Sequence, residues 1–426
     1  MRGRLSVVTV GCKANFADSA SIVAHAHRAG FDVVSSGEPA DVLVINSCTV
    51  THRADRDCRA LARRLRRENP GAVLVMTGCF AETAPEAAES LPEVDHWVGI
   101  REPSALPDLL RSLSGETAER DEGIREHSAD LLLGHTRTFL KIQDGCDSAC
   151  AYCIVPRARG AARSLPRREV VERAVRAERD GAREIVLTGI HAGRYGADRG
   201  ERDGLAELVR CLLGATSRCR FRLGSIEPME ITPGLAALLS TRDRVCPHLH
   251  VPLQSGSDRV LRRMRRPYTA AQYRERLAML GAEVPGIRLG ADVIAGFPGE
   301  TAGDFELTLR VVHETPLSYL HVFPYSPRAG TESAGWADDV APQEKKRRVA
   351  VLREADRKIA MRYLALQQGK TLTVAVESID PSTGERRGTT ENYVEAAFPP
   401  PAGAPGDLVP VRILSVRGER LEGVPV

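Results

Sequence analysis

The sequence predicts an α/β protein built from three units. Short runs rich in Val and Ile alternate with helical stretches twice along the chain, first up to about residue 112 and again from about residue 137. This alternation predicts parallel sheets covered by helices: a small sheet at the N-terminal end and a partial (β/α)6 barrel in the middle. From residue 369 onward the strand-like runs are broken by Gly and Pro, which predicts a small antiparallel β-barrel.

The composition is that of an ordinary globular protein with more than one domain. Of 426 residues, 42% are hydrophobic and 27% are charged, and the net charge of +3 only weakly favours an acidic partner. The first residues lack the apolar run of a signal peptide, and no later run is long enough to span a membrane. We therefore expect a cytoplasmic protein with no membrane association. Its ten cysteines then serve as metal ligands or redox groups rather than as disulfides.

Three cysteines of the first segment each follow a predicted strand. Cys12, Cys48 and Cys79 come after the runs "LSVVTV", "DVLVIN" and "AVLVMT". Ligands of open α/β sheets bind beyond the carboxyl ends of the strands, so we expect these thiols to converge on one site in a domain of residues 1–112. The alternative is that they are small buried hydrophobic side chains. That interpretation is favoured for the cysteines without such a context: Cys58, Cys211, Cys219 and Cys246.

The middle of the chain carries its polar motifs at the ends of predicted strands. A charged stretch at 113–136 lacks periodicity and is expected to be a linker. Between residues 137 and 340, strand-like runs lead into Gly, Pro and polar residues in "FLKIQDGC", "EIVLTGIHAG", "FRLGSIEP", "HLHVPLQSG", "LGADVIAGFPGE" and "LHVFPYSPRAG". Chemistry in (β/α) barrels occurs on the loops at the carboxyl ends of the strands, where these motifs fall. Ordinary βα turns would explain one or two of them, but not the set.

One loop of this segment gathers three thiols. Cys146, Cys150 and Cys153 lie within the stretch "CDSACAYC". A structural zinc site usually has four ligands, and this loop offers neither a fourth cysteine nor a nearby histidine. Three thiolates suit an iron–sulfur cluster, because one iron then stays free to bind another molecule. Zinc and purely redox roles are the alternatives.

The spacing C-x3-C-x2-C, with Tyr152 before the last cysteine, resembles the signature of radical S-adenosylmethionine (SAM) enzymes. The likeness extends along most of the chain and becomes more specific. Taken in order, "GCKAN", "NSCTV", "TGC", "CDSACAYCIVPRARG", "LTGIHAGRYG", "VPLQSGSD", "GADVIAGFPGET" and "FPYSPRAGT" resemble the methylthiotransferase family. That family joins a cysteine-containing N-terminal domain to a radical SAM barrel and a TRAM domain. Leu165 and Pro166 depart from its pattern, which often has a basic residue here, so the contacts of this loop stay open.

The resemblance implies two [4Fe–4S] clusters, one on Cys12, Cys48 and Cys79 and one on the catalytic trio Cys146, Cys150 and Cys153. The second would cleave SAM to a radical that removes a hydrogen from the substrate, and the first would carry the sulfur. Residues after the barrel strands are implied to bind SAM or substrate: Tyr152, Thr188, Gly189, Ser225, Glu227, Gln254 and Asp292. For each of the last six, a buried hydrogen-bonding role unrelated to SAM is the alternative.

The C-terminal part predicts an RNA-binding module. Residues 341–368 read as a charged amphipathic helix leading out of the barrel, and residues 369–426 hold the strand-like runs. The TRAM domain that they resemble binds RNA, as many small barrels do. Basic clusters such as "RRMRRP" and "PRARG" would contact phosphates if they faced one surface, although each alone suits a solvated helix face. We expect the module to be removable without exposing much of the catalytic core.

The favoured function is a tRNA methylthiotransferase acting at carbon 2 of N6-threonylcarbamoyladenosine beside the anticodon. Lys13 and Ala14 follow the first cysteine where the isopentenyladenosine subgroup more often has Gln-Met. The alternatives are methylthiotransferases acting on isopentenyladenosine of tRNA or on a ribosomal-protein aspartate, and, from another class, a non-catalytic iron–sulfur RNA-binding protein. We also expect a monomer that takes electrons from a donor such as flavodoxin or ferredoxin, and sulfur from a separate source.

Overall fold

The computed structural model describes residues 3–115 and 126–426. Its N-terminal part is a parallel five-stranded sheet in the order β2-β1-β3-β4-β5. The expected strands are β1, β3 and β4, and the short β2 and β5 extend the sheet at its two edges. The strand bounds are β1 Arg4–Thr9, β2 Asp32–Val34, β3 Val42–Ser47, β4 Val73–Gly78 and β5 His96–Trp97.

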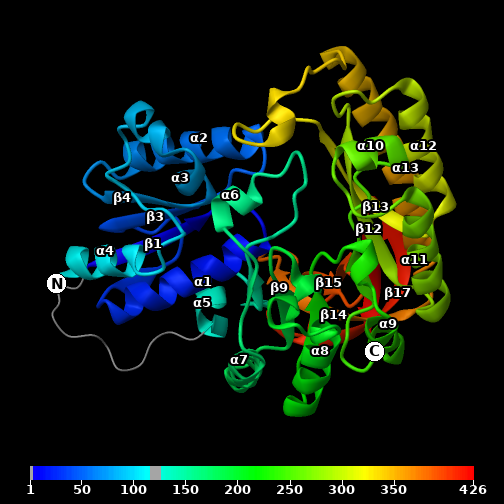
Figure 1. Ribbon diagram of the computed structural model, residues 1–426. Helices are drawn as coiled ribbons and strands as arrows, with labels where there is room; N and C mark the ends of the chain where they lie inside the picture. Colours follow the sequence, from blue (N-terminus) through cyan, green and yellow to red (C-terminus); the bar gives the residue numbers. More distant parts are fainter. Residues whose placement is uncertain (1–2, 116–125) are drawn as a thin grey trace.

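Helices cover both faces of this sheet (Figure 1). Val42 and Val44 of β3 belong to the core that packs against α1 and α4, whereas Leu43 and Ile45 belong to the core under α2. Because both faces are covered, the strands are continuous apolar runs rather than alternating ones. The helix bounds are α1 Lys13–Arg28, α2 His52–Glu68, α3 Cys79–Thr83, η1 Pro85–Ser90, α4 Ala105–Ser114 and α5 Glu126–Leu132.

Helix α5 lies inside the stretch that the sequence predicts to be a linker. Ala129 is buried in the core of the N-terminal part, and Leu132 and Leu133 pack against that core. Asp130 accepts a hydrogen bond of 3.0 Å from the Phe139 amide at the start of the barrel. Three apolar residues at helical spacing are therefore enough to dock this segment. Residues 116–125 of the stretch lie outside the described residues.

The middle part is a partial (β/α)6 barrel, as predicted. Its parallel strands form two sheets, β6-β9-β10 and β11-β12-β13. Bridges between Phe221 and Val245 and between Ser225 and His250 join the two sheets. The strand bounds are β6 Thr138–Lys141, β9 Glu184–Thr188, β10 Arg220–Leu223, β11 His248–His250, β12 Arg288–Ala295 and β13 Leu317–Pro324, with a small hairpin of β7 Gln143–Asp144 and β8 Arg163–Ser164.

Helix α1 of the N-terminal part packs against β6, and helix α13 packs against β13 at the other edge of the barrel. Each following helix returns the chain to the next strand, as the alternation predicts. The remaining helices are α6 Val155–Arg159, α7 Arg167–Arg179, α8 Gly204–Ala215, α9 Pro233–Thr241, α10 Asp258–Arg263, α11 Ala270–Glu283, α12 Ala302–Glu314 and α13 Pro342–Ala365, with short 3-10 helices η2 Ala192–Arg194, η3 Ala197–Arg199, η4 Pro228–Glu230 and η5 Glu332–Gly335.

Helix α13 leads into a closed five-stranded barrel in the order β14-β15-β16-β18-β17. Its neighbouring strands are antiparallel except for β16 and β18, which are parallel. Tyr393 has a positive φ of 65° and turns the chain between β15 and β16, so the strand-like run "GTTENYVEAAF" is divided between two strands. The strands are β14 Thr371–Ile379, β15 Arg386–Thr390, β16 Glu395–Phe398, β17 Leu408–Arg417 and β18 Arg420–Pro425. Strand β18 was not predicted from the sequence.

The turn between β15 and β16 fits into the base of the (β/α)6 barrel. The guanidinium of Arg222 is completely buried and donates hydrogen bonds to the carbonyl oxygens of Thr390 (2.9 Å) and Glu391 (3.0 Å). The ring of Tyr393 lies 4.5 Å from the ring of His248, centroid to centroid. The expectation that this module is removable is therefore wrong. Its loss would remove two carbonyl acceptors from this buried guanidinium, leaving it only its bonds to Glu184 among those described, and would expose the base of the catalytic barrel.

Candidate functional site

The first three predicted cysteines meet at one edge of the N-terminal sheet. Cys12 caps the start of α1 after β1, Cys48 follows β3, and Cys79 begins α3 directly after β4. These strands are neighbours in the sheet, so their carboxyl ends bring the thiols together. Burial raises the pKa of Cys79 to about 12, and the adjacent Cys12 and Cys48 act in the same direction. The charge of Arg159 opposes this rise in the pKa of Cys79.

Two glycines let these loops approach each other. At Gly11, where φ is +137°, an added Cβ would lie 2.9 Å from the Cβ of Cys48. At Gly78, where φ is +96°, it would lie 2.4 Å from the carbonyl oxygen of Ser47. Other residues would be strained at these φ values and would push the cysteine loops apart.

The second trio lies on the loop between β7 and α6, and charged side chains face two of its sulfurs. His191 Nδ1 is 3.5 Å from the sulfur of Cys146, and its Nε2 is 2.6 Å from a carboxylate oxygen of Glu230. Arg266 donates to the sulfur of Cys150 at 3.2 Å and pairs with Glu227. Burial would raise the pKa of Cys146, but the hydrogen bonds from His191 and Ser148 lower it. Cys150, whose pKa burial raises, faces the positive charge of Arg266.

Arg159 joins the barrel to the residues around the first trio. It follows the second trio in the sequence and is 3% exposed. Its guanidinium donates to Asp18 at 2.7 Å and to Asp144 at 3.1 Å, and reaches the side-chain oxygen of Asn15 at 3.4 Å. That same oxygen accepts a hydrogen bond from the thiol of Cys12 at 3.3 Å. A residue of the barrel thus completes the surroundings of the first trio.

Arg328 holds the loop after Cys48 against the barrel. It donates to Thr49 at 2.5 Å and to Asp55 at 2.7 Å, and it lies 3.2 Å from His52 Nδ1. All three partners belong to the N-terminal part, whereas Arg328 follows β13. The N-terminal part and the barrel are therefore joined by ion pairs on both sides of the cysteine sites.

A cavity of about 180 Å³ lies where the two parts meet. Val50 and Thr51, which follow Cys48, form one wall, and Tyr152, from between Cys150 and Cys153, contributes another. The barrel contributes Asp292 and Phe323, among others. We call this the interdomain pocket. A molecule bound there would face the loops of both trios.

A second cavity, of about 320 Å³, lies beside the loop of Cys146. Ser148, His191, Glu227, Glu230 and Arg266 are among its lining residues. Its wall therefore includes the charged side chains that contact the second trio. The first trio contributes nothing to this lining.

The predicted SAM or substrate residues divide between these cavities. Tyr152, Gln254 and Asp292 line the interdomain pocket, and Glu227 lines the cavity beside Cys146. The other predicted residues lie outside both linings. The carbonyl of Thr188 accepts a hydrogen bond from Ile142, an added Cβ at Gly189 would touch Gln143, and the hydroxyl of Ser225 is 3.5 Å from the carbonyl oxygen of His250.

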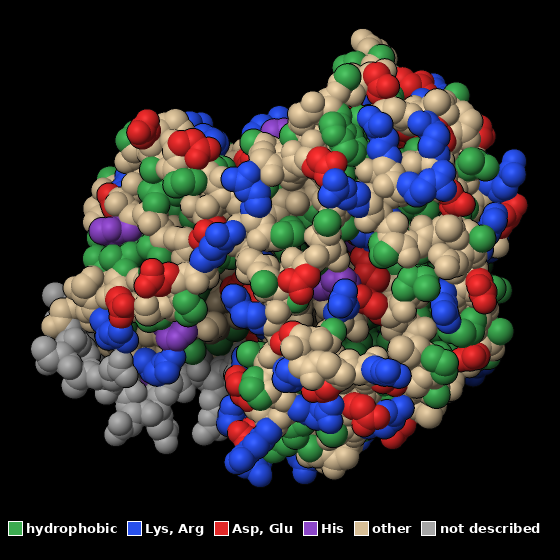
Figure 2. All heavy atoms as spheres, in the orientation of Figure 1, with side chains coloured by type: hydrophobic (Ala, Val, Ile, Leu, Met, Phe, Trp, Pro, Cys, Tyr) green, Lys and Arg blue, Asp and Glu red, His purple; other side chains and the backbone are tan. Residues whose placement is uncertain are grey.

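The charged residues that face the thiols were not predicted from the sequence. His191 lies in "TGIHAG", and Arg328, which pairs with Asp55 rather than with a thiol, lies in "FPYSPRAG". Arg159 and Arg266 lie in basic clusters expected to contact phosphates, but their side chains are buried against the cysteine loops. Burial is what distinguishes these arginines from solvated ones, and the sequence does not show it. On the face drawn in Figure 2, Lys and Arg are interspersed with Asp and Glu rather than gathered in one patch.

Comparisons with known proteins match this geometry. Residues 4–99 match the model of an uncharacterized protein family, UPF0004, and residues 140–312 match the radical SAM superfamily. The threonylcarbamoyladenosine tRNA methylthiotransferase MtaB of Bacillus subtilis is 36% identical over 95% of this chain and 92% of its own. The chain belongs to the radical SAM methylthiotransferase family. It is therefore an enzyme, and the expectation of SAM and two [4Fe–4S] clusters is confirmed for it as a member of this family.

Further relatives are named for two different modified bases of tRNA. The Thermotoga maritima MtaB is 34% identical over 92% of this chain and 90% of its own. The tRNA-2-methylthio-N(6)-dimethylallyladenosine synthase of Chloroflexus aurantiacus is 34% identical over 99% of this chain and 91% of its own. Among solved structures, the radical SAM methyltransferase TsrM of Kitasatospora setae has a TM-score of 0.56 at 14% identity, over 78% of this chain and 77% of its own, which shows a shared fold. In the described residues, no helix is long and apolar enough to cross a membrane.

Proposed function

We propose that this enzyme attaches a methylthio group to carbon 2 of N6-threonylcarbamoyladenosine in tRNA, beside the anticodon. The observation that carries the proposal is the interdomain pocket, lined by the loops of both cysteine trios. A base bound there would be within reach of both reactive centres. The names of the Bacillus and Thermotoga relatives support tRNA and this modified base as the substrate.

In this proposal Cys12, Cys48 and Cys79 hold one [4Fe–4S] cluster, and the loop of Cys146, Cys150 and Cys153 holds the other. The donor sets fit, because each offers three thiols and leaves a fourth position for an outside ligand. When bound, the second cluster supplies the electron that cleaves SAM, and the first supplies the sulfur.

The chain's own residues hold and surround these reactants. Arg266 and His191 place positive or hydrogen-bonding groups on the second trio, and Arg159 donates to Asn15, which is bonded to Cys12 of the first. Phe323, which is 39% exposed in the interdomain pocket, offers an aromatic face on which a base can stack. Val50 and Thr51 form the wall of the pocket on the side of the first trio.

The cavity beside Cys146 is the candidate site for the methionine portion of SAM. Arg266 and Glu227 bring opposite charges to its wall, which suits the carboxylate and the amino group of an amino acid. Tyr152, Gln254 and Asp292 then remain for the rest of SAM or for the base. Thr188, Gly189 and Ser225 line neither cavity, and in this proposal they act indirectly, by supporting the strands that carry the lining residues.

Two alternatives concern the substrate. The Chloroflexus relative is named for dimethylallyladenosine at similar identity, so overall identity does not separate the two bases. The branch that modifies a ribosomal-protein aspartate is less favoured, since the Bacillus, Thermotoga and Chloroflexus relatives are all named for tRNA. Four predictions accompany a tRNA substrate and stay predictions: flavodoxin or ferredoxin as electron donor, a separate sulfur source, a monomeric state and a cytoplasmic location.

Nucleoside analysis of tRNA from a deletion strain tests the proposal. The strain should accumulate N6-threonylcarbamoyladenosine without its methylthio derivative, while methylthio-isopentenyladenosine stays at its normal level. Re-expression of the intact gene should restore the lost nucleoside, and a Cys150→Ala gene should not. Loss of the isopentenyl derivative instead would assign the enzyme to the other base.

A further inference from the structure

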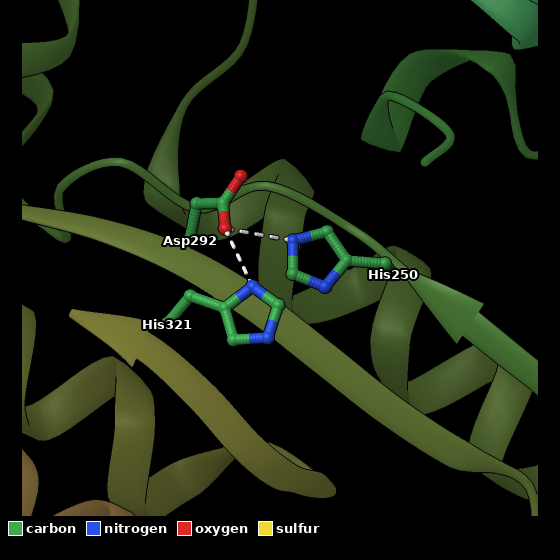
Figure 3. Close-up of side chains that lie close together, drawn as sticks. All are labelled: His250, Asp292 and His321. Carbon is green, nitrogen blue, oxygen red and sulfur yellow. Dashed lines mark hydrogen bonds and ion pairs between the residues drawn. The ribbon is translucent and has the colours of Figure 1, made fainter. Parts of the chain in front are cut away.

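Three side chains on neighbouring strands meet inside the barrel: His250 on β11, Asp292 on β12 and His321 on β13 (Figure 3). One oxygen of Asp292 lies 3.0 Å from His250 Nε2 and 3.2 Å from His321 Nδ1. Both imidazoles therefore share a single carboxylate oxygen. Burial alone would raise the pKa of Asp292, but the two imidazoles hold it well below its usual range.

The His250 ring is also held by a hydrogen bond at its other nitrogen, Nδ1. Its Nδ1 lies 3.2 Å from the hydroxyl of Tyr319, and that hydroxyl lies 2.8 Å from His248 Nε2. His250 is 9% exposed and His248 is fully buried. This hydrogen-bonded chain sets the orientation of the His250 ring, and the ring in turn sets the position of Asp292.

His321 differs from His250 because much of its side chain is exposed to solvent. Its side chain is 54% exposed, and Asp292 engages only its Nδ1 edge. In Figure 3 the other ring nitrogen points away from the carboxylate. His321 lies two residues before Phe323 on the same strand, so the two side chains project from the same face of β13. Phe323 and Asp292 both line the interdomain pocket, so the open edge of His321 lies beside that pocket.

We propose that His321, oriented by Asp292, is the residue that selects the substituent on the modified adenosine. This inference rests on the proposed function and assigns the polar substituent to this edge of the pocket. With Nδ1–H donating to Asp292, a neutral imidazole presents Nε2 as an acceptor for a hydroxyl or an amide N–H. A protonated one presents a donor to a carboxylate. The threonylcarbamoyl group carries all of these partners.

An isopentenyl group offers none of them. If it covered this edge, it would remove water from His321 without replacing the lost hydrogen bonds, which is unfavourable. A site built to hydrogen-bond its substrate rejects an analogue that lacks the polar group far more strongly than an apolar pocket rejects a polar one. SAM is a weaker candidate for this edge, because the pocket also includes Val50 and Thr51 beside the first trio.

The test compares kcat/KM of reconstituted full-length enzyme on two tRNAs, one with threonylcarbamoyladenosine and one with isopentenyladenosine. His321→Leu should lower the ratio of the two values by about 100-fold or more. His321→Gln, which keeps a hydrogen-bonding side chain, should preserve much of the ratio. Release of 5′-deoxyadenosine without tRNA is measured for each variant, so that a loss of SAM cleavage is separated from a change in base selection. His313→Leu, at an exposed histidine of α12, is the matched control and should leave the ratio as in the wild type.

An unchanged ratio in an active His321→Leu enzyme would overturn the inference. So would a stoichiometric zinc or other non-iron metal that the wild type retains and His321→Leu loses, because the three side chains would then serve a cation. If the wild type leaves threonylcarbamoyladenosine unmodified but modifies isopentenyladenosine, the proposed function falls first, and this inference falls with it. The wild-type measurement thus separates the two failures.

Discussion

The two cysteine trios offer the same number of thiols but are assembled in different ways. The second lies on one loop, where the backbone alone sets its spacing, and cationic residues of the barrel contact it directly. The first collects single cysteines from the ends of three strands. Arg159, which donates to Asn15 beside this trio, comes from the barrel. One site is therefore local, whereas the other is complete only when the N-terminal part is docked on the barrel.

The largest expected effect comes from removing one thiol of each trio. Anaerobically reconstituted wild-type enzyme should contain about eight irons per chain, and Cys150→Ala and Cys48→Ala should each retain about four. Cys150→Ala should abolish reductive cleavage of SAM. Cys48→Ala should still release 5′-deoxyadenosine but transfer no methylthio group. Iron analysis and product chromatography measure both outcomes.

The separation of roles fails if folded Cys48→Ala loses SAM cleavage as completely as Cys150→Ala does. Stoichiometric zinc in the wild type, or four irons in place of eight, would remove one cluster assignment or both.

Arg159→Ala should break the contact between the barrel and the residues around the first trio. Among the described residues it leaves Asp18 and Asp144 with Lys141 as their cationic partner. Loss of one member of such a buried network should lower the free energy of unfolding by about 3 kcal/mol. Denaturant unfolding of the apoprotein measures this loss. Electron paramagnetic resonance should show a changed signal of the first cluster and an unchanged signal of the second.

Arg168→Ala is the control for that variant, because Arg168 is almost fully exposed and its ion pair within the described part of the chain is with Glu172 of the same helix. It should behave as the wild type. If Arg159→Ala changed the signals of both clusters equally, the contribution of Arg159 would not be specific to the first trio.

Tyr393→Ala tests whether the first site also depends on the C-terminal barrel. The Tyr393 ring packs on His248, and the ammonium of Lys13, the residue after Cys12, lies 4.8 Å from its centroid. Loss of the ring should cost about 2 kcal/mol of stability. Tyr393→Phe keeps both ring contacts and should cost less than half as much. Thermal unfolding of the two variants compares them, and equal losses would place the contribution in the hydroxyl.

The smallest expected effect concerns RNA binding by the outer face of the C-terminal barrel. Arg412 and Arg417 are exposed on β17. If both contact phosphates, replacing both with Gln should weaken tRNA binding several-fold and reduce the slope of log affinity against log salt by about two. Arg357→Gln, at an exposed arginine of α13, is the control. An unchanged slope in the double variant would place the RNA on another face.

The sequence predicted the parts of the site that depend on strand order and local spacing. Cys12, Cys48 and Cys79 could be grouped because parallel strands end at one edge, and Cys146, Cys150 and Cys153 could be grouped by spacing alone. The partners Arg159, Arg266 and Arg328 could not be assigned, because nothing in an arginine-rich stretch distinguishes a buried guanidinium from a solvated one. The insertion of Tyr393 into the barrel base was likewise missed, since it joins segments more than a hundred residues apart.

That insertion has a consequence for biosynthesis. Arg222 and His248 are synthesised well before the turn that covers them. The barrel base therefore stays open until this turn has left the ribosome, and its folding can finish only then. A chain stalled or truncated before residue 390 would present an unfinished barrel to chaperones and proteases.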